Sequence, residues 1–237
     1  IRQMQVEHLR FAYPQAKEII HDLSFTAHAG EIIGITGPVA CGKSTLGKVF
    51  LCEYPYEGSI RFDGVELADM EPSKRAAIVG YLGHDPELMN DTLENNILMG
   101  DAGEYLRQVC LKEEADAMGD GLQTKIGSSG VRLSGGQAQR LSLARTLCHK
   151  RPLLILDDPF SALDRKTEQE IFKNLQKETE NSIVLLISHR LYLFPKLSKV
   201  IWMEQGNTVV APHEELLKVV PEYRSLFEDQ EAAKDEV

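Results

Sequence analysis

The chain has 237 residues, of which 43% are hydrophobic and 26% charged, a composition typical of soluble proteins with a sizeable core. It has no apolar run near the roughly 20 residues that a membrane-spanning helix needs. The formal net charge of −10 and the lack of a basic stripe argue against nucleic acid as a partner.

The four cysteines are scattered without the spacing of a disulfide framework or a metal site, which favours reduced thiols in a cytosolic setting. They are Cys41, Cys52, Cys110 and Cys148. The sequence begins with Ile1 and lacks the charged and apolar regions of a signal peptide. We therefore interpret it as a segment of a longer protein.

The first third of the sequence alternates short apolar runs with turn residues, which predicts strands with an antiparallel component. These strands are expected over residues 6–13, 23–27 and 59–62. Asp63-Gly64 follows the third of them as a hairpin-type turn. A further apolar strand over 31–36 runs into a glycine-rich turn, and a helix is predicted from Lys43 onward.

Helical spacing dominates the middle of the chain, and β-type apolar runs return after it. Helices are expected over residues 92–99, 105–111 and 137–149. Buried strands are expected over 153–156 and 183–187, with a helix beyond Asp164 between them. A weak strand pair, 200–203 and 208–211, then precedes a final helix and an acidic tail over 228–237. The order predicts an α/β fold with a parallel sheet, an antiparallel β subdomain and an inserted helical subdomain.

The segment GPVACGKS, residues 37–44, matches the pattern G-x-x-x-x-G-K-[ST] between a predicted strand and a predicted helix. Its glycines let backbone N–H groups face phosphate oxygens at a helix N-terminus. In such a loop Lys43 reaches the β and γ phosphates of ATP, and Ser44 ligates Mg²⁺. The expected ATP contacts are Gly37, Pro38, Val39, Ala40, Cys41, Gly42, Lys43, Ser44 and Thr45.

A phosphate-binding loop also needs an acid on the metal side. Asp157 stands at the carboxyl end of the apolar run 153–156, which is the edge of a parallel sheet where ligands bind. We predict that Asp157 and Ser44 hold Mg²⁺.

The segment LSGGQ, residues 133–137, opens a predicted helix that Ser134 is placed to cap. A hydroxyl, two glycine amides and a helix N-terminus suit an anion. LSGGQ resembles the signature motif of the ATP-binding cassette (ABC) family. The resemblance implies ATP contacts from Ser134, Gly135, Gly136 and Gln137.

The resemblance extends over nearly the whole chain and implies a P-loop NTPase core. Tyr13 matches the aromatic residue that stacks on adenine, Asp164 closes the D-loop string SALD, and His189 matches the switch histidine at the γ-phosphate. The implied core covers about 1–83 and 151–227, the helical subdomain about 84–150, and the tail 228–237. Cassettes of this family pair head to tail, so that ATP lies between the phosphate loop of one and the signature motif of the other.

Three stretches are similar to those of exporters, namely 91–96, 123–130 and 213–217. The resemblance implies transmembrane domains fused upstream, a place at the cytoplasmic face of a membrane, and Mg-ATP as the energy source. Ser128 departs from the exporter pattern, which has glutamate there. The cargo cannot be predicted, because membrane helices outside this sequence select it.

Two further departures fall at the ATP site. Asp158 stands where the family has the glutamate that positions or deprotonates the attacking water, and its carboxylate is set back by about 1 Å, enough to slow chemistry. His84 replaces the Q-loop glutamine, a contact of the metal and of water. We therefore predict an ATPase whose own site turns over slowly, the degenerate half of a heterodimeric exporter.

Alternatives stay open at this point. A homodimeric exporter that uses aspartate as a weak base is the rival within the family. A soluble cassette ATPase without a transport role, or a cassette that only regulates gating through bound ATP, are the others.

Overall fold

The computed structural model describes residues 1–98 and 100–233. Its larger sheet has six strands in the order β10-β9-β3-β8-β7-β6. Neighbours in this sheet are parallel except β9 and β10, which form an antiparallel pair. The strands are β3 (Ile32–Thr36), β6 (Val79–Leu82), β7 (Leu153–Asp157), β8 (Ile183–Ile187), β9 (Lys199–Glu204) and β10 (Asn207–Ala211).

The second sheet is antiparallel, in the order β2-β1-β4-β5, as the first third of the sequence predicts. Its strands are β1 (Gln3–Ala12), β2 (Glu18–His28), β4 (Glu57–Phe62) and β5 (Val65–Glu66). Asp63 and Gly64 join β4 to β5 with φ values of 47° and 84°. Positive φ at both central residues is typical of a hairpin turn, which confirms the prediction at this position.

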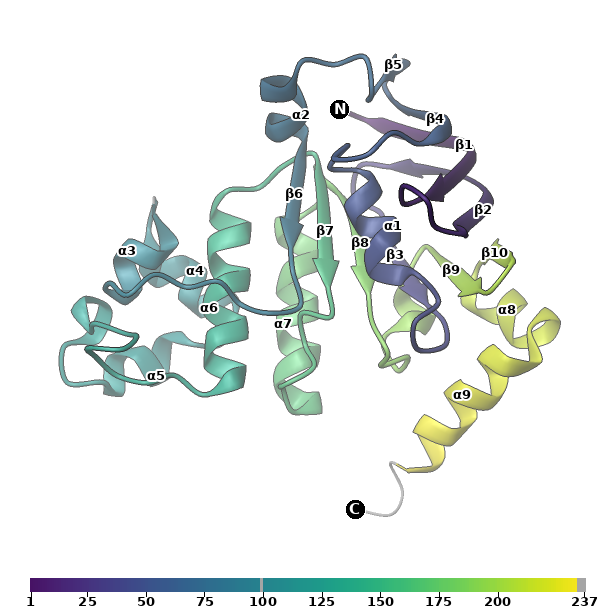
Figure 1. Cartoon of the computed structure of the whole chain (residues 1–237). Helices are drawn as coiled ribbons and strands as arrows, with labels where there is room; N and C mark the ends of the chain where they lie inside the picture. Colours follow the sequence, from purple (N-terminus) through teal and green to yellow (C-terminus); the bar gives the residue numbers. More distant parts are fainter. Residues whose placement is uncertain (99, 234–237) are drawn as a thin grey trace.

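Figure 1 shows the helices in two groups around the six-stranded sheet. The helices between β6 and β7 lie together beside the edge strand β6, with α3 and α4 packed on α6. They are α3 (Leu93–Ile97), α4 (Ala102–Gln108), α5 (Lys112–Ala117) and α6 (Gly135–Cys148), with a 3₁₀ turn η1 (Gly121–Gln123). The others are α1 (Lys43–Val49), α2 (Pro72–Ile78), α7 (Arg165–Glu178), the turn η2 (Phe194–Lys196), α8 (His213–Val219) and α9 (Pro221–Ala232).

The six-stranded sheet is covered on both faces. Leu154 and Leu156 of β7 belong to one apolar cluster, with residues of α6 and α7, whereas Leu153 and Ile155 belong to a second cluster, with residues of α1 and the antiparallel sheet. Successive side chains of a strand point to opposite faces, so a strand buried on both faces is apolar throughout. The unbroken apolar runs of the sequence therefore mark the centre of the fold.

The expected acidic tail is wrong over its first residues, because α9 continues to Ala232. The side chains of Gln230 and Glu231 hold this end of the helix through bonds to Leu191 and Arg165. Residues 234–237 lie outside the described residues, as does 99, the last residue of the helix expected over 92–99. The helix expected over 105–111 runs instead from Ala102 to Gln108, since Asp101 caps it.

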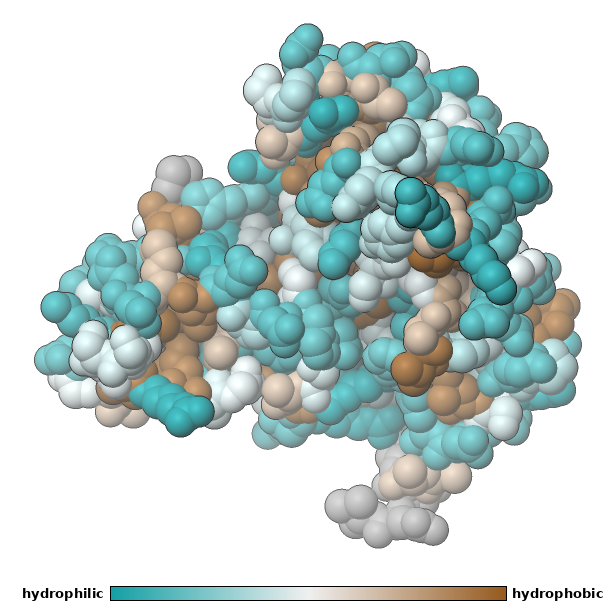
Figure 2. Space-filling model, in the orientation of Figure 1, coloured by the Kyte–Doolittle hydropathy of each residue, from teal (hydrophilic) through white to brown (hydrophobic). Residues whose placement is uncertain are grey.

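The visible face of the molecule is mostly hydrophilic, and apolar side chains gather over the helices between β6 and β7 (Figure 2). Met89, Leu98 and Val131 of this region are between 41% and 52% exposed. Within the described residues, no helix combines the length and the apolar character that crossing a membrane requires.

Candidate functional site

The loop between β3 and α1 is shaped by residues that tolerate unusual backbone. Ala40 and Gly42 have φ values of 62° and 99°. A Cβ atom on Gly42 would lie 2.3 Å from Cγ2 of Ile19, and one on Gly37 would lie 2.0 Å from the carbonyl oxygen of Met203. Both glycines are therefore required by close approach, as the phosphate-loop pattern predicts.

Lys43 lies over this loop and is only 7% exposed. Its Nζ atom donates to the carbonyl oxygens of Gly37, at 2.9 Å, and Pro38, at 2.7 Å. Among the described residues, no carboxylate lies within ion-pair distance of Lys43, and the N–H groups of 39–42 have no protein partner. A buried cation and unpaired N–H donors fit an anionic phosphate chain.

A pocket of about 350 Å³ opens above the loop. It is lined by Ile19, Val39, Ala40, Cys41, Gly42, Lys43, Ser44, Thr45 and His189. The loop follows β3 and His189 follows β8, two neighbouring parallel strands, so both lie at the carboxyl edge of the sheet. The structure thus brings together the phosphate-loop residues and the predicted switch histidine.

Asp157 ends β7 at the same edge and is 5% exposed. Its Oδ2 atom accepts a hydrogen bond from the hydroxyl of Tyr81 at 2.9 Å. Burial, and after it the charge of Asp157, raises the pKa of Tyr81, so this phenol stays a donor. Within the described residues no three His, Cys, Asp or Glu side chains form a metal cluster. That donor set fits Mg²⁺, which takes one or two protein ligands together with phosphate oxygens and water.

The two departures from the family pattern lie side by side. Nδ1 of His84 is 3.5 Å from Oδ2 of Asp158, with the histidine side chain 58% exposed and the aspartate 14%. Asp158 has a φ of 52°, a left-handed conformation that aspartate adopts more readily than most residues. Burial raises the pKa of Asp158, while the nearby His189 and His84 oppose that rise.

The signature segment is a capped helix start, as predicted. Ser134 Oγ accepts from the N–H of Gln137 at 3.1 Å, and Gln137 Oε1 accepts from the N–H of Ser134 at 2.9 Å, which is a capping box. Gln137 Nε2 also donates to Glu114 of α5 at 2.9 Å. Ser134, Gly135, Gly136 and Gln137 are absent from the lining of the phosphate-loop pocket. In Figure 1 the start of α6 and the start of α1 lie well apart.

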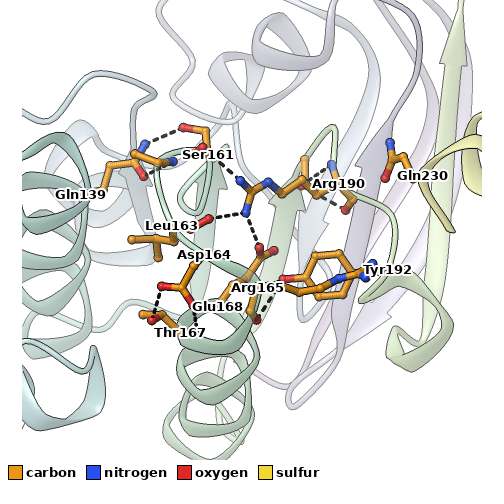
Figure 3. A network of polar contacts seen from close by, with 12 residues as sticks. Gln139, Ser161, Leu163, Asp164, Arg165, Thr167, Glu168, Arg190, Tyr192 and Gln230 are labelled. Atoms are coloured by element: carbon orange, nitrogen blue, oxygen red, sulfur yellow. Dashed lines mark hydrogen bonds and ion pairs between the residues drawn. The ribbon is translucent and has the colours of Figure 1, made fainter. Parts of the chain in front are cut away.

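A polar network joins α6 to the loops after β7 and β8 (Figure 3). Gln139 Nε2 donates to Ser161 Oγ at 2.7 Å, and Gln139 Oε1 accepts from the N–H of Ala162 at 3.0 Å. Arg190 then donates to the carbonyl oxygen of Leu163 and to Glu168 Oε2, both at 2.7 Å. The segment 161–164 is therefore held from both the signature helix and the segment that follows His189.

Two predicted contact residues have partners within the chain. Tyr13 is half-buried and packs edge-on against the rings of Phe11 and Tyr54, with centroids 5.0 and 5.4 Å away. The carboxylate of Asp164 caps α7 by accepting from the N–H and hydroxyl of Thr167, and these bonds lower its pKa. Their roles at adenine and at a partner's ATP stay predictions.

The structure adds residues that the sequence did not single out. Tyr81 orients the metal-side carboxylate, Arg190 holds the segment 161–164, and Gln230 contacts the backbone on both sides of His189. The pattern before Asp157 identifies an acid but contains no sign of its distant tyrosine partner. A predicted packing of the final helix on the loop after β8 is the one signal that would have pointed to Gln230.

The parallel sheet, the phosphate loop and the acid at the sheet edge define a P-loop nucleotide-binding domain. The family model described as ABC transporter matches residues 20–161, which is more than half of the chain. The chain belongs to the ABC transporter family and is an ABC-type ATPase domain.

The chain is similar to nucleotide-binding parts of larger transporters. It is 34% identical to a probable multidrug resistance ABC transporter ATP-binding/permease protein of Bacillus subtilis, over 94% of this chain and 40% of that protein. It is 36% identical to an ATP-dependent lipid A-core flippase of Pseudomonas savastanoi, over 90% of this chain and 38% of that protein. A bacterial Atm1-family ABC exporter solved with ATP bound matches with a TM-score of 0.89 and 29% identity, covering 97% of this chain and 42% of that one. The chain thus spans about two fifths of these proteins.

Proposed function

We propose that this chain binds Mg-ATP in the pocket over its phosphate loop and, by ATP-dependent pairing with a second cassette, powers export across a membrane. The observation that carries the proposal is the buried, unpaired cation of Lys43 beside N–H donors without protein partners. The separation of Ser134 from that pocket supports pairing, because a signature segment remote from its own phosphate loop is available to a second copy of the site. In this arrangement Tyr13 stacks on adenine and His189 contacts the γ-phosphate.

The Mg²⁺ ion would be held by Ser44 and Asp157 together with phosphate oxygens, where it would neutralise charge on the phosphates. Tyr81 fixes the carboxylate that faces it. Asp158 and His84 occupy the positions of the water-positioning and metal-contacting residues. Because His84 turns toward Asp158 at 3.5 Å, the pair uses its polar atoms on each other. We infer that this site holds ATP and hydrolyses it slowly.

The remaining parts of the proposed transporter follow from the relatives. Those relatives are named as permeases, flippases or exporters, and this chain covers about two fifths of their length. We assign the described fold to a core of about 1–83 and 151–227 and a helical subdomain of about 84–150, at the cytoplasmic face of a membrane. A groove of about 550 Å³ between Leu88, Met89, Ile126 and Leu133 gives the membrane domains a place to contact it.

The slow-site proposal is tested by steady-state ATP hydrolysis and by binding of Mg-ATP, both on the unchanged chain. Asp158→Glu with His84→Gln restores the family residues, and turnover is expected to rise on the order of a hundredfold with little change in affinity. Lys43→Met is the matched loss-of-binding control. Brisk turnover of the unchanged chain, with no gain in the double variant, would contradict a degenerate site.

The partner is proposed to be an unlike cassette that carries glutamate and glutamine at these two positions. Co-purification of the full-length protein from its source, followed by mass spectrometry of the associated chains, distinguishes this from a homodimer. Recovery of a single transporter chain with full transport activity would favour the homodimeric alternative, in which Asp158 acts as a weak base.

A further inference from the structure

Gln230, near the end of α9, contacts the backbone on both sides of His189. Its Nε2 atom donates to the carbonyl oxygen of His189 at 2.7 Å, although the two residues are 41 positions apart. Its Oε1 atom accepts from the N–H of Leu191 at 2.8 Å. A side-chain amide that donates and accepts at once can bridge two backbone groups in this way, which neither a carboxylate nor an apolar side chain can do.

The backbone around His189 has two other anchors, and they do not bond to His189 itself. The N–H of Ser188 donates to the carbonyl oxygen of Ile35 at 3.1 Å, which ties the loop to β3. Arg190 ties it to the segment after β7 through Leu163, at 2.7 Å. Figure 3 shows Arg190 reaching toward that segment, with Gln230 on the other side. Among the described residues, the carbonyl of His189 has Gln230 as its one hydrogen-bond partner.

The packing of α9 on the domain does not depend on Gln230. Tyr223, in the first turn of α9, is fully buried and packs edge-on against Trp202, with ring centroids 5.7 Å apart. Its hydroxyl lies 2.7 Å from Nδ1 of His213. At the other end, Glu231 forms an ion pair with Arg165 at 3.2 Å. The helix is therefore anchored at both ends by other side chains, and the bonds of Gln230 act on the loop.

We propose that Gln230 is a positioning residue that fixes the backbone of His189, and with it the direction of the imidazole into the phosphate pocket. The side chain of His189 is exposed and lines that pocket, so its own backbone decides where its ring points. The proposal rests on the proposed function, in which His189 contacts the γ-phosphate. It makes the terminal helix part of the device that distinguishes ATP from ADP.

The test compares dissociation constants for Mg-ATP and Mg-ADP in four versions of the chain: unchanged, His189→Ala, Gln230→Met and Glu231→Ala. Loss of a hydrogen bond to a charged group predicts that His189→Ala lowers the ATP-over-ADP preference about tenfold. Gln230→Met keeps the length of the side chain and is expected to lower that preference about threefold or more, with ADP affinity unchanged. Glu231→Ala removes an anchor of α9 without touching the loop and is expected to keep the preference.

Each outcome separates the proposals. If His189→Ala lowers the preference and Gln230→Met does not, the positioning role is wrong and the proposed function stands. If Glu231→Ala lowers it as much as Gln230→Met, the effect comes from helix docking, which also overturns the positioning role. If His189→Ala leaves the preference unchanged, the γ-phosphate contact is wrong, and the positioning role is overturned with it. Thermal midpoints of all four versions show whether each variant is folded.

Discussion

Replacing Arg190 with methionine is expected to destabilise the domain, because its partner Glu168 is buried. Glu168 lies in the first turn of α7 and is 1% exposed, and its Oε2 atom is 2.7 Å from Nη1 of Arg190. The same guanidinium donates to the carbonyl oxygens of Leu163 and Ser161. The Arg190→Met change would leave a carboxylate without its cation, in a place from which water is excluded.

The magnitude follows from that geometry. Removing one partner of a buried ion pair costs about 3–5 kcal/mol. Since the Arg190 side chain is 36% exposed, we expect a loss of about 3 kcal/mol, at the lower end of that range. Burial raises the pKa of Glu168 even with the arginine present, so without it the carboxyl binds a proton more readily in the folded state than in the unfolded one. The loss of stability should therefore be small below pH of about 4.5 and grow as pH rises.

Urea unfolding of four chains measures this effect: unchanged, Arg190→Met, Glu168→Gln and the double variant, each at pH 5 and pH 8. Glu168→Gln keeps the size of the side chain and removes its charge, so the double variant should recover much of the stability lost in Arg190→Met. Contacting residues are expected to be non-additive in such a cycle. A loss below about 1 kcal/mol at pH 8, or the same loss with and without the Glu168 charge, would refute the reasoning.

Three further predictions concern the site and the core. Lys43→Met should weaken Mg-ATP binding by about tenfold or more, because the charged donor is lost, as measured by nucleotide titration beside a thermal midpoint. Gly47→Ala should cost about 1–3 kcal/mol in urea unfolding, since the new Cβ would lie 3.0 Å from Ile155 Cγ2 and 3.1 Å from the Tyr81 ring. Burial lowers the pKa of His213, so stability should be lost as pH falls below about 6.5, and His213→Gln should flatten that dependence of the thermal midpoint between pH 7.5 and 5.5.

The sequence predicted the central strands well, because burial on both faces leaves a continuous apolar run. The strand expected over 183–187 is β8, and the one expected over 153–156 differs from β7 only by Asp157. The edge strand β6 was missed, because two of its four residues, Gly80 and Tyr81, are only partly buried. A short run with a glycine carries too little periodicity to be distinguished from a loop.

The candidate site shows the same division between local and distant information. The phosphate loop and the capped start of α6 are encoded in strings of five to eight neighbouring residues, and the structure has them as predicted. The side chains that orient them come from far along the chain: Tyr81 contacts Asp157 across 76 positions, and Glu114 contacts Gln137 across 23. A single polar residue at such a separation leaves no pattern in one sequence, so only the fold reveals its partner.

The contact between His84 and Asp158 changes how the departures from the family pattern are understood. In the sequence they are two unrelated substitutions, each expected to weaken hydrolysis by itself. In the structure their side chains are 3.5 Å apart, and therefore they form one feature. Residues in contact couple, so restoring either family residue alone leaves its neighbour matched to the wrong partner. We therefore expect Asp158→Glu and His84→Gln each to raise turnover by much less than half, on a logarithmic scale, of what the double change achieves, whereas independent losses would give two gains that multiply.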